Sequence, residues 1–238
     1  MLARAVFWAA TLAVLVVAIR SAVVGPIPLP WSIAVAVAWV ALFAGLLRHV
    51  NLGAFVDVVT KGPGRGVALT VDGLPSSRAL PALLAACEER SIALAFFLTA
   101  EEARARASDV GALADGGHQV GLRVPRGVSA RALDDVTTLG ATAGEPPSLV
   151  RIEAWGTPAL ERALGKRDLL AVGWSVGAQH LRSRERVAAR VREGARAGGV
   201  IALGPGLDAE LLGAVLDELA ELRLAVEPLA RVLGVDAR

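Results

Sequence analysis

The stretch that decides the fold is residues 66–75, GVALTVDGLP, an apolar run that ends in one aspartate and a turn. A short strand with its polar residue at the carboxyl end is typical of parallel α/β proteins, whose functional side chains lie at that edge. Asp72 is therefore either the remnant of an active site or the polar tip of a core strand. The segments that follow the other strands help to distinguish these two interpretations.

From Gly66 onward, short apolar runs alternate with longer stretches of helical periodicity, which predicts parallel strands joined by helices. The predicted strands are 67–71, 92–98, 118–124, 149–152, 169–176, 200–203 and 224–226. The predicted helices are 78–90, 100–114, 130–139, 158–164, 184–197 and 208–221. About seven such units fit a closed or nearly closed (β/α) barrel better than an open sheet, with the chemistry at the carboxyl ends of the strands.

Two apolar segments precede this domain. Residues 5–24 and 31–47 are each close to the roughly 20 residues that a helix needs to cross a bilayer. A cleaved signal peptide with one anchor and a buried soluble hairpin are the alternatives, but RSAVVGPIP offers a poor cleavage site. We therefore expect a two-span membrane anchor over 1–50, a linker over 51–65 and a domain over 66–238. We expect this anchor in the inner or plasma membrane. Basic residues at the outer ends of the hairpin outnumber the one in its loop, which favours a cytoplasmic domain.

The composition limits the partners. The 238 residues are 54% hydrophobic with a mean hydropathy of +0.54, enough for a full core and for the apolar N-terminal segments. Acidic and basic residues are interspersed and the net charge is +2, so nothing indicates nucleic acid as a partner. Cys87 is the only cysteine and lies on an apolar stripe, which excludes an intramolecular disulfide and favours a buried thiol. Residues 182–196 are arginine-rich and predict a helix with one solvated basic face, or alternatively one that contacts anionic lipid headgroups.

The segments around the strands occur in a distinctive order: TVDGLP, LAFFLTA, GGHQVGLRVPRG, VRIEAWG, VGWSV and GGVIALGPG. In that order they resemble the polysaccharide deacetylase family, also called NodB-homology or carbohydrate esterase family four, over about residues 66–228. The resemblance implies a NodB-like, distorted β/α barrel. It also implies a family chemistry in which a divalent metal, usually zinc, assists the removal of acetyl groups from carbohydrate.

The resemblance assigns roles to particular positions, and most of them are altered. In the first motif, TFDDGP, the catalytic-base aspartate corresponds to Asp72 and the metal-binding second aspartate to Gly73. The two histidine ligands of the second motif correspond to Arg123 and Gly127, so all three protein ligands are replaced. In the R-x-P-Y motif, Arg151 matches the arginine that orients the base.

The remaining motifs are also incomplete. Trp155 replaces the aromatic residue of the third motif, and Trp174 survives from the fourth while Gly177 takes the place of its acid. Where the family supplies a histidine general acid after the last apolar strand, this sequence has Gly204 and Pro205. Only Asp72 and Arg151 thus remain of the polar machinery that the resemblance implies.

These replacements bear directly on the chemistry. A family deacetylase needs a metal to polarise the carbonyl and activate water, a base to take the proton of that water, and an acid for the leaving amine. Glycine cannot coordinate a metal, and Arg123 introduces a permanent positive charge where the cation would lie. The resemblance therefore implies a degenerate member without bound metal. Arg123 is then a candidate counterion that holds Asp72 ionised in a structural pair.

We expect a membrane-anchored pseudoenzyme that binds glycan or a lipid-linked sugar, with the bilayer and carbohydrate as its partners. Trp155 and Trp174 are candidate stacking surfaces for a sugar, although Trp174 also fits a core position. One alternative is residual metal-independent N- or O-deacetylation by Asp72 with His180. Another is a scaffold for a second membrane protein.

Overall fold

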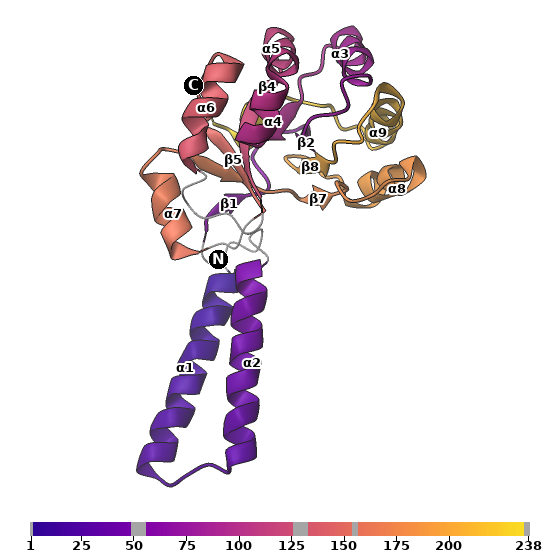
Figure 1. Cartoon of the computed structure of the whole chain (residues 1–238). Helices are drawn as coiled ribbons and strands as arrows, with labels where there is room; N and C mark the ends of the chain where they lie inside the picture. Colours follow the sequence, from indigo (N-terminus) through magenta and orange to yellow (C-terminus); the bar gives the residue numbers. More distant parts are fainter. Residues whose placement is uncertain (1, 49–55, 126–132, 154–156, 236–238) are drawn as a thin grey trace.

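The structure is a computed structural model that describes residues 2–48, 56–125, 133–153 and 157–235. Two long helices, α1 (Leu2–Val23) and α2 (Leu29–Arg48), run side by side and project from an α/β domain (Figure 1). The domain is built on one eight-stranded sheet, and every pair of neighbouring strands in it is parallel.

The strands lie in the order β1-β6-β5-β4-β3-β2-β8-β7. Their bounds are β1 Val58–Val59, β2 Ala68–Asp72, β3 Ala95–Leu98, β4 Gln119–Val124, β5 Leu149–Ile152, β6 Leu170–Val172, β7 Val176–Gly177 and β8 Val200–Leu203. The sheet curls, but its edge strands β1 and β7 are not neighbours in this order, so the barrel is open. The predicted β/α architecture is confirmed as a NodB-like half-barrel.

Helices cover the outer face of the sheet (Figure 1). Their bounds are α3 Leu80–Glu89, α4 Ala100–Ala105, α5 Ala107–Asp115, α6 Asp135–Ala143, α7 Pro158–Gly165, α8 Arg184–Gly194 and α9 Ala209–Glu221, whereas the short helix α10 (Leu229–Leu233) packs on the other face. Side chains on a strand alternate between faces, so Leu69 and Val71 of β2 join the larger core beneath these helices. Ala68 faces the other way, into a smaller apolar cluster that α10 completes with Leu229 and Val232.

Several predicted elements differ from the structure. The predicted strand 169–176 is two strands, β6 and β7, because the chain leaves the sheet at Gly173 and Trp174 between them. The predicted strand 224–226 is reduced to a single bridge between Val226 and Val67. The predicted helix 100–114 is interrupted at Arg106. The segment 51–65, expected to be a linker, contributes β1, which pairs with β6.

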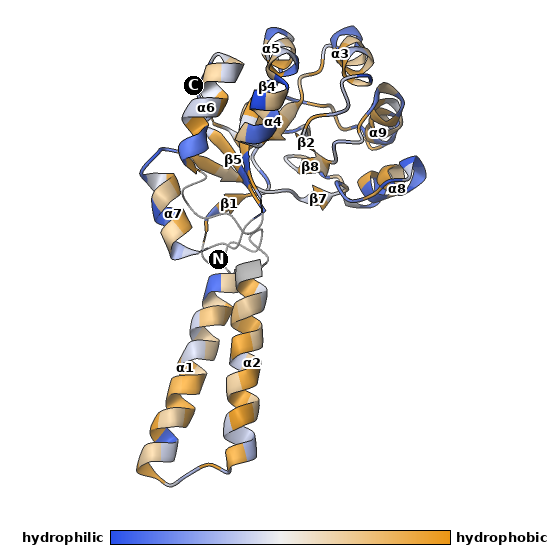
Figure 2. Cartoon of the chain, in the orientation of Figure 1, coloured by the Kyte–Doolittle hydropathy of each residue, from blue (hydrophilic) through white to orange (hydrophobic). Residues whose placement is uncertain are grey.

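The two N-terminal helices pack as a defined pair. The indole N–H of Trp39 donates a hydrogen bond to the hydroxyl of Thr11 on the facing helix, at 3.2 Å. The rings of Trp39 and Phe43 stack at 5.5 Å, and Phe7 contacts both. Outside this seam the helices expose apolar side chains along their length (Figure 2). Both helices are long and apolar enough to cross a membrane.

Candidate functional site

The inward-facing residues at the carboxyl ends of β2 to β5 form one polar cluster. On β2, Thr70 and Asp72 share the face of Ala68, which points into the half-barrel. The strand register places Asp72 beside Phe97 of β3, and Arg123 of β4 beside Arg151 of β5. We call this end of the half-barrel the mouth, following the usual location of sites in β/α folds.

Arg151 lies at the base of the mouth and is fully buried. One terminal nitrogen, Nη2, donates a hydrogen bond to Thr70 Oγ1 at 2.9 Å, and the other, Nη1, lies 3.3 Å from Asp72 Oδ1. The guanidinium lies over the rings of Phe97 and Trp174, at 4.4 and 5.2 Å from their centroids. Burial lowers the pKa of Arg151 and the charge of Asp72 opposes that shift. Guanidinium is nonetheless protonated in proteins, so the buried charge needs these partners.

Asp72 is the other half of this buried ion pair. Burial raises the pKa of the Asp72 carboxyl above its ordinary value, and the positive charge of Arg151 limits the rise. Glu153 raises the pKa further, while Arg123 and His180 lower it. Asp72 is therefore surrounded by fixed charges and held by a structural partner, as a buried carboxylate must be.

Arg123 does not form the ion pair with Asp72 that the sequence suggested. Its Nη2 lies 2.8 Å from Glu102 Oε1 and its Nη1 lies 3.5 Å from Glu153 Oε1. Burial alone would lower the pKa of Arg123, but the hydrogen bond and charge of Glu102 raise it, and Glu153 and Asp72 contribute. The expectation was wrong because Arg151 already pairs with Asp72, while two half-exposed glutamates stand closer to Arg123.

Glu102 is positioned by the start of α4. Thr99 caps this helix in a capping box: its hydroxyl accepts from the Glu102 N–H, and Glu102 Oε2 accepts from the Thr99 N–H at 2.8 Å. The other carboxylate oxygen of Glu102 is then free to accept from Arg123. The sequence T-A-E-E carried the signal of this cap, but its link to the mouth depends on the fold.

The residues at the family's metal-ligand positions do not fit a metal ion. Gly73 occupies the place of the second aspartate at φ +103°, a conformation that favours glycine. A side chain at Gly73 would bring its Cβ to 3.2 Å from Glu102 Oε1 and 3.7 Å from Arg123 Nη2. The Arg123–Glu102 pair thus fills the space beside Gly73, and the guanidinium would repel a cation there. Within the described ranges, no three histidine, cysteine or acidic side chains gather in a group that could hold a metal.

The other predicted site residues have different positions. Trp174 is half-buried, and the guanidinium of Arg151 covers part of its ring. His180 is exposed and near enough for its charge to act on Asp72. Trp155 and Gly127 lie outside the described residues. Two residues that sequence reasoning missed, Glu102 and Glu153, complete the mouth cluster, which we define as Asp72, Glu102, Arg123, Arg151 and Glu153.

No protein-family model matches the chain, and no curated protein matches it significantly. Solved structures of carbohydrate esterase family 4 proteins do match. The wild-type pseudoenzyme BA3943 from Bacillus anthracis aligns with a TM-score of 0.67 at 14% identity, over 74% of this chain and 69% of that one. The domain has the polysaccharide deacetylase fold. The peptidoglycan N-acetylglucosamine deacetylase Bc1960 aligns with a TM-score of 0.67 at 19% identity, over 79% and 97% of the two chains. PdaA of Bacillus subtilis gives 0.64 at 13% identity, over 81% and 88%.

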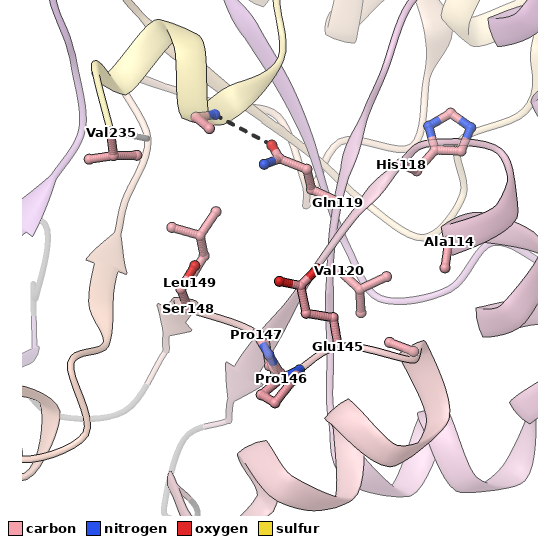
Figure 3. A pocket seen from close by; sticks show the side chains of 12 residues that line it. Ala114, His118, Gln119, Val120, Glu145, Pro146, Pro147, Ser148, Leu149 and Val235 are labelled. Atoms are coloured by element: carbon pink, nitrogen blue, oxygen red, sulfur yellow. Dashed lines mark hydrogen bonds between the residues drawn. The ribbon is translucent and has the colours of Figure 1, made fainter. Parts of the chain in front are cut away.

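The polysaccharide deacetylase-like domain also has a pocket of about 300 Å³ at the amino ends of β4 and β5, away from the mouth (Figure 3). His118 borders it, but its Nδ1 accepts a hydrogen bond from the Leu94 N–H at 3.1 Å, and the side chain is 7% exposed. Burial lowers the pKa of His118, which favours a neutral ring. Gln119 Oε1 accepts from the Ala230 N–H at 3.4 Å, so this residue ties α10 to the sheet.

Proposed function

We propose that the protein is a membrane-anchored pseudoenzyme of the polysaccharide deacetylase fold that binds glycan without deacetylating it. One observation carries the proposal: Arg123, held by Glu102 and Glu153, stands beside Gly73 where the family chemistry needs a metal. A fixed guanidinium cannot lower the pKa of a water molecule as a divalent metal does. Because it is positively charged, it also cannot coordinate such a metal.

The base and acid positions support the same proposal. Asp72 is 3% exposed, whereas a general base must come within hydrogen-bonding distance of the water that it deprotonates. At the position of the general acid, Gly204 and Pro205 have no titratable side chain. The general-acid position and the metal-ligand positions Gly73 and Arg123 therefore cannot play their parts in the family reaction.

The mouth keeps features that suit a sugar ligand. Three of its polar side chains, Glu102, Arg123 and Glu153, have intermediate exposure and can contact a ligand. Trp174 is half-buried and could offer a sugar only the part of its ring that Arg151 does not cover. These features support glycan binding at the mouth.

Membrane anchoring by the α1–α2 hairpin is part of this proposal. Trp8 near the domain end of the hairpin and Trp31 near its turn are 66% and 68% exposed. Exposed tryptophans near both ends of an apolar segment match the aromatic belts of membrane-spanning helices. Arg4 at one end and Arg20 at the other can reach the two headgroup regions. The excess of basic residues at the outer ends of the hairpin over the one in its loop supports a cytoplasmic domain as part of the proposal.

Two assays on the full chain in detergent micelles test the proposal. N-acetylglucosamine oligomers should show no acetate release, with or without added zinc, and saturable binding to at least one glycan of a broad panel is expected. Acetate release would refute the pseudoenzyme proposal, and a flat titration against every glycan would refute the binding proposal.

A specific observation favours one alternative, residual hydrolysis by Asp72 with His180. His180 is close enough to Asp72 for its charge to lower the pKa of that carboxyl. This alternative predicts acetate release that chelators do not affect and that Asp72→Ala abolishes. Activity of wild-type protein that survives chelation would support it against our proposal.

A further inference from the structure

Helix α8 carries arginines on two opposite sides, and one of these sides packs against α9. Arg184 forms an ion pair with Glu210 of α9. Arg192 donates two hydrogen bonds to the carboxylate of Glu218 on the same helix, both at 2.6 Å. Arg184 and Arg192 therefore define the side of α8 that faces its neighbour.

The opposite side of α8 carries Arg186 and Arg190. Successive residues of an α-helix lie about 100° apart, so these two arginines share one side and lie roughly opposite Arg184 and Arg192. Arg186 and Arg190 are exposed, and neither forms an ion pair within the part of the chain that the structure describes. Glu193 lies on the same side and offsets one of the two charges. Because a guanidinium stays protonated in proteins, this side of α8 keeps a net positive charge.

The fold turns this side of α8 toward the hairpin. Figure 1 shows α8 on the side of the domain from which α1 and α2 project, with α9 lying farther from the hairpin. Since Arg184 and Arg192 face α9, Arg186 and Arg190 face the opposite way. They are thus directed toward the level at which the hairpin meets the domain.

Contacts between distant segments support this arrangement. Near the start of α1, Arg4 lies 2.8 Å from the carboxylate of Asp57, the residue before β1. A few residues further along the chain, Lys61 forms a β-bridge with Gly199, which follows soon after the end of α8. One short segment therefore links the domain end of the hairpin to the end of α8.

We propose that the Arg186–Arg190 side of α8 contacts anionic phosphate headgroups of the bilayer that the hairpin crosses, and so fixes the orientation of the domain on the membrane. The inference rests on the proposed membrane anchoring and adds a second point of attachment. Basic side chains that lie close to an anionic membrane surface are attracted to it. The planar guanidinium can also donate paired hydrogen bonds to a lipid phosphate.

The test measures how close α8 lies to the headgroups of the full chain in lipid nanodiscs. A fluorophore is attached to Ala189→Cys, at an exposed position of α8, and is quenched by lipids that carry a spin label on the headgroup. The reference label is on Ser108→Cys, exposed on α5 at the end of the domain farthest from the hairpin (Figure 1). The natural Cys87 does not compete for the label, because it is buried and its thiol pKa is raised to about 11.

Two lipid compositions are compared: phosphatidylcholine alone and an equal mixture with phosphatidylglycerol. The α8 label should be quenched at least about twofold more strongly in the anionic discs, because each arginine near an anionic surface favours contact by about fivefold. The α5 label should show no such difference. High salt concentration should remove the effect on the α8 label.

Charge variants assign the contact to this side of α8. Combining Arg186→Gln with Arg190→Gln should reduce quenching of the α8 label in anionic discs to the level seen in neutral discs, and Glu193→Gln should increase it. The matched control combines Arg78→Gln with Arg90→Gln, which removes the same charge from exposed residues that flank α3, far from the hairpin (Figure 1). This control should keep the full effect of anionic lipid. A thermal melt of each variant checks that the domain remains folded.

The outcomes separate this inference from the proposed anchoring. If the α8 label is quenched no more in anionic discs than in neutral discs, the headgroup contact is overturned, while recovery of the protein in the discs leaves the anchoring in place. If the Arg78 and Arg90 control reduces quenching as much as the α8 variant does, the attraction is a general charge effect and the assigned surface is wrong. If the full chain does not enter the discs, both proposals fail.

Discussion

Replacement of Arg151 by methionine would test whether the buried ion pair with Asp72 is structural. Methionine keeps most of the side-chain length but removes the charge, the contact at 3.3 Å with Asp72 Oδ1 and the hydrogen bond to Thr70. Breaking a buried pair by removing one partner typically costs about 3–5 kcal/mol, because the remaining charge stays buried without compensation. At roughly 2–4 °C per kcal/mol for a domain of this size, the melting temperature should fall by about 10 °C.

The same variant predicts a definite pH dependence. Burial already raises the folded-state pKa of Asp72, and loss of Arg151 removes the group that most opposes this shift. A carboxyl with a raised folded-state pKa favours the folded state most at low pH, and this contribution is lost as pH rises through that pKa. The stability deficit of Arg151→Met should therefore be smaller at pH 5 than at pH 8.

A double variant provides the control. Adding Asp72→Asn to Arg151→Met removes both charges and should recover roughly 2 kcal/mol relative to Arg151→Met alone, because no buried charge remains uncompensated. Between pH 5 and pH 8, the stability of the double variant should vary no more with pH than the stability of the wild type does. Urea unfolding of the full chain in detergent micelles, followed by tryptophan fluorescence, measures all three proteins. A deficit of Arg151→Met below about 1 kcal/mol that does not vary with pH would refute the structural pair.

Three further predictions concern packing, the thiol and the cap. Gly121→Ala should destabilise the domain by about 1–3 kcal/mol, since the new Cβ would lie 2.6 Å from the Phe97 ring. Gly111→Ala, in open space on α5, should instead stabilise the domain by about 0.5–1 kcal/mol. Equal urea midpoints of the two variants would contradict this difference. Cys87 is buried and burial raises the pKa of its thiol to about 11, so a thiol reagent at pH 8 should label it only after unfolding, and rapid labelling of native protein would show this prediction wrong. Thr99→Ala removes the cap that holds Glu102 and should lower stability by about 1 kcal/mol, whereas an unchanged thermal melt would show that the cap is dispensable.

Much of this architecture could be predicted from local sequence patterns. The apolar run of β2 and its terminal aspartate fix both the strand and the edge at which Asp72 lies, because parallel strands place such residues at one end. The apolar runs of β3, β5 and β8 are equally clear, and their strands are confirmed. The two residues of β1 carry too little periodicity to be recognised, and β1 exists only because β6 pairs with it, whereas β7 was predicted only as the end of one longer strand.

The charge pairing of the site could be predicted only in part. The replacement of metal ligands by Gly73 and Arg123 is visible in the sequence, but the partner of Arg123 is not. Glu102 and Glu153 lie on α4 and just beyond β5, and only the curl of the sheet brings them to the same guanidinium. Side chains that approach across strands depend on register and twist, which motif order does not specify.

The most direct test of the central claim, that Arg123 and its two glutamates take the place of a metal site, is zinc binding by the full chain. The protein, purified in detergent micelles, would be stripped with a chelator, checked by elemental analysis and titrated with zinc in a calorimeter. We predict no saturable zinc binding and no change in melting temperature on addition of zinc. One tightly bound equivalent that Asp72→Ala abolishes would contradict the account.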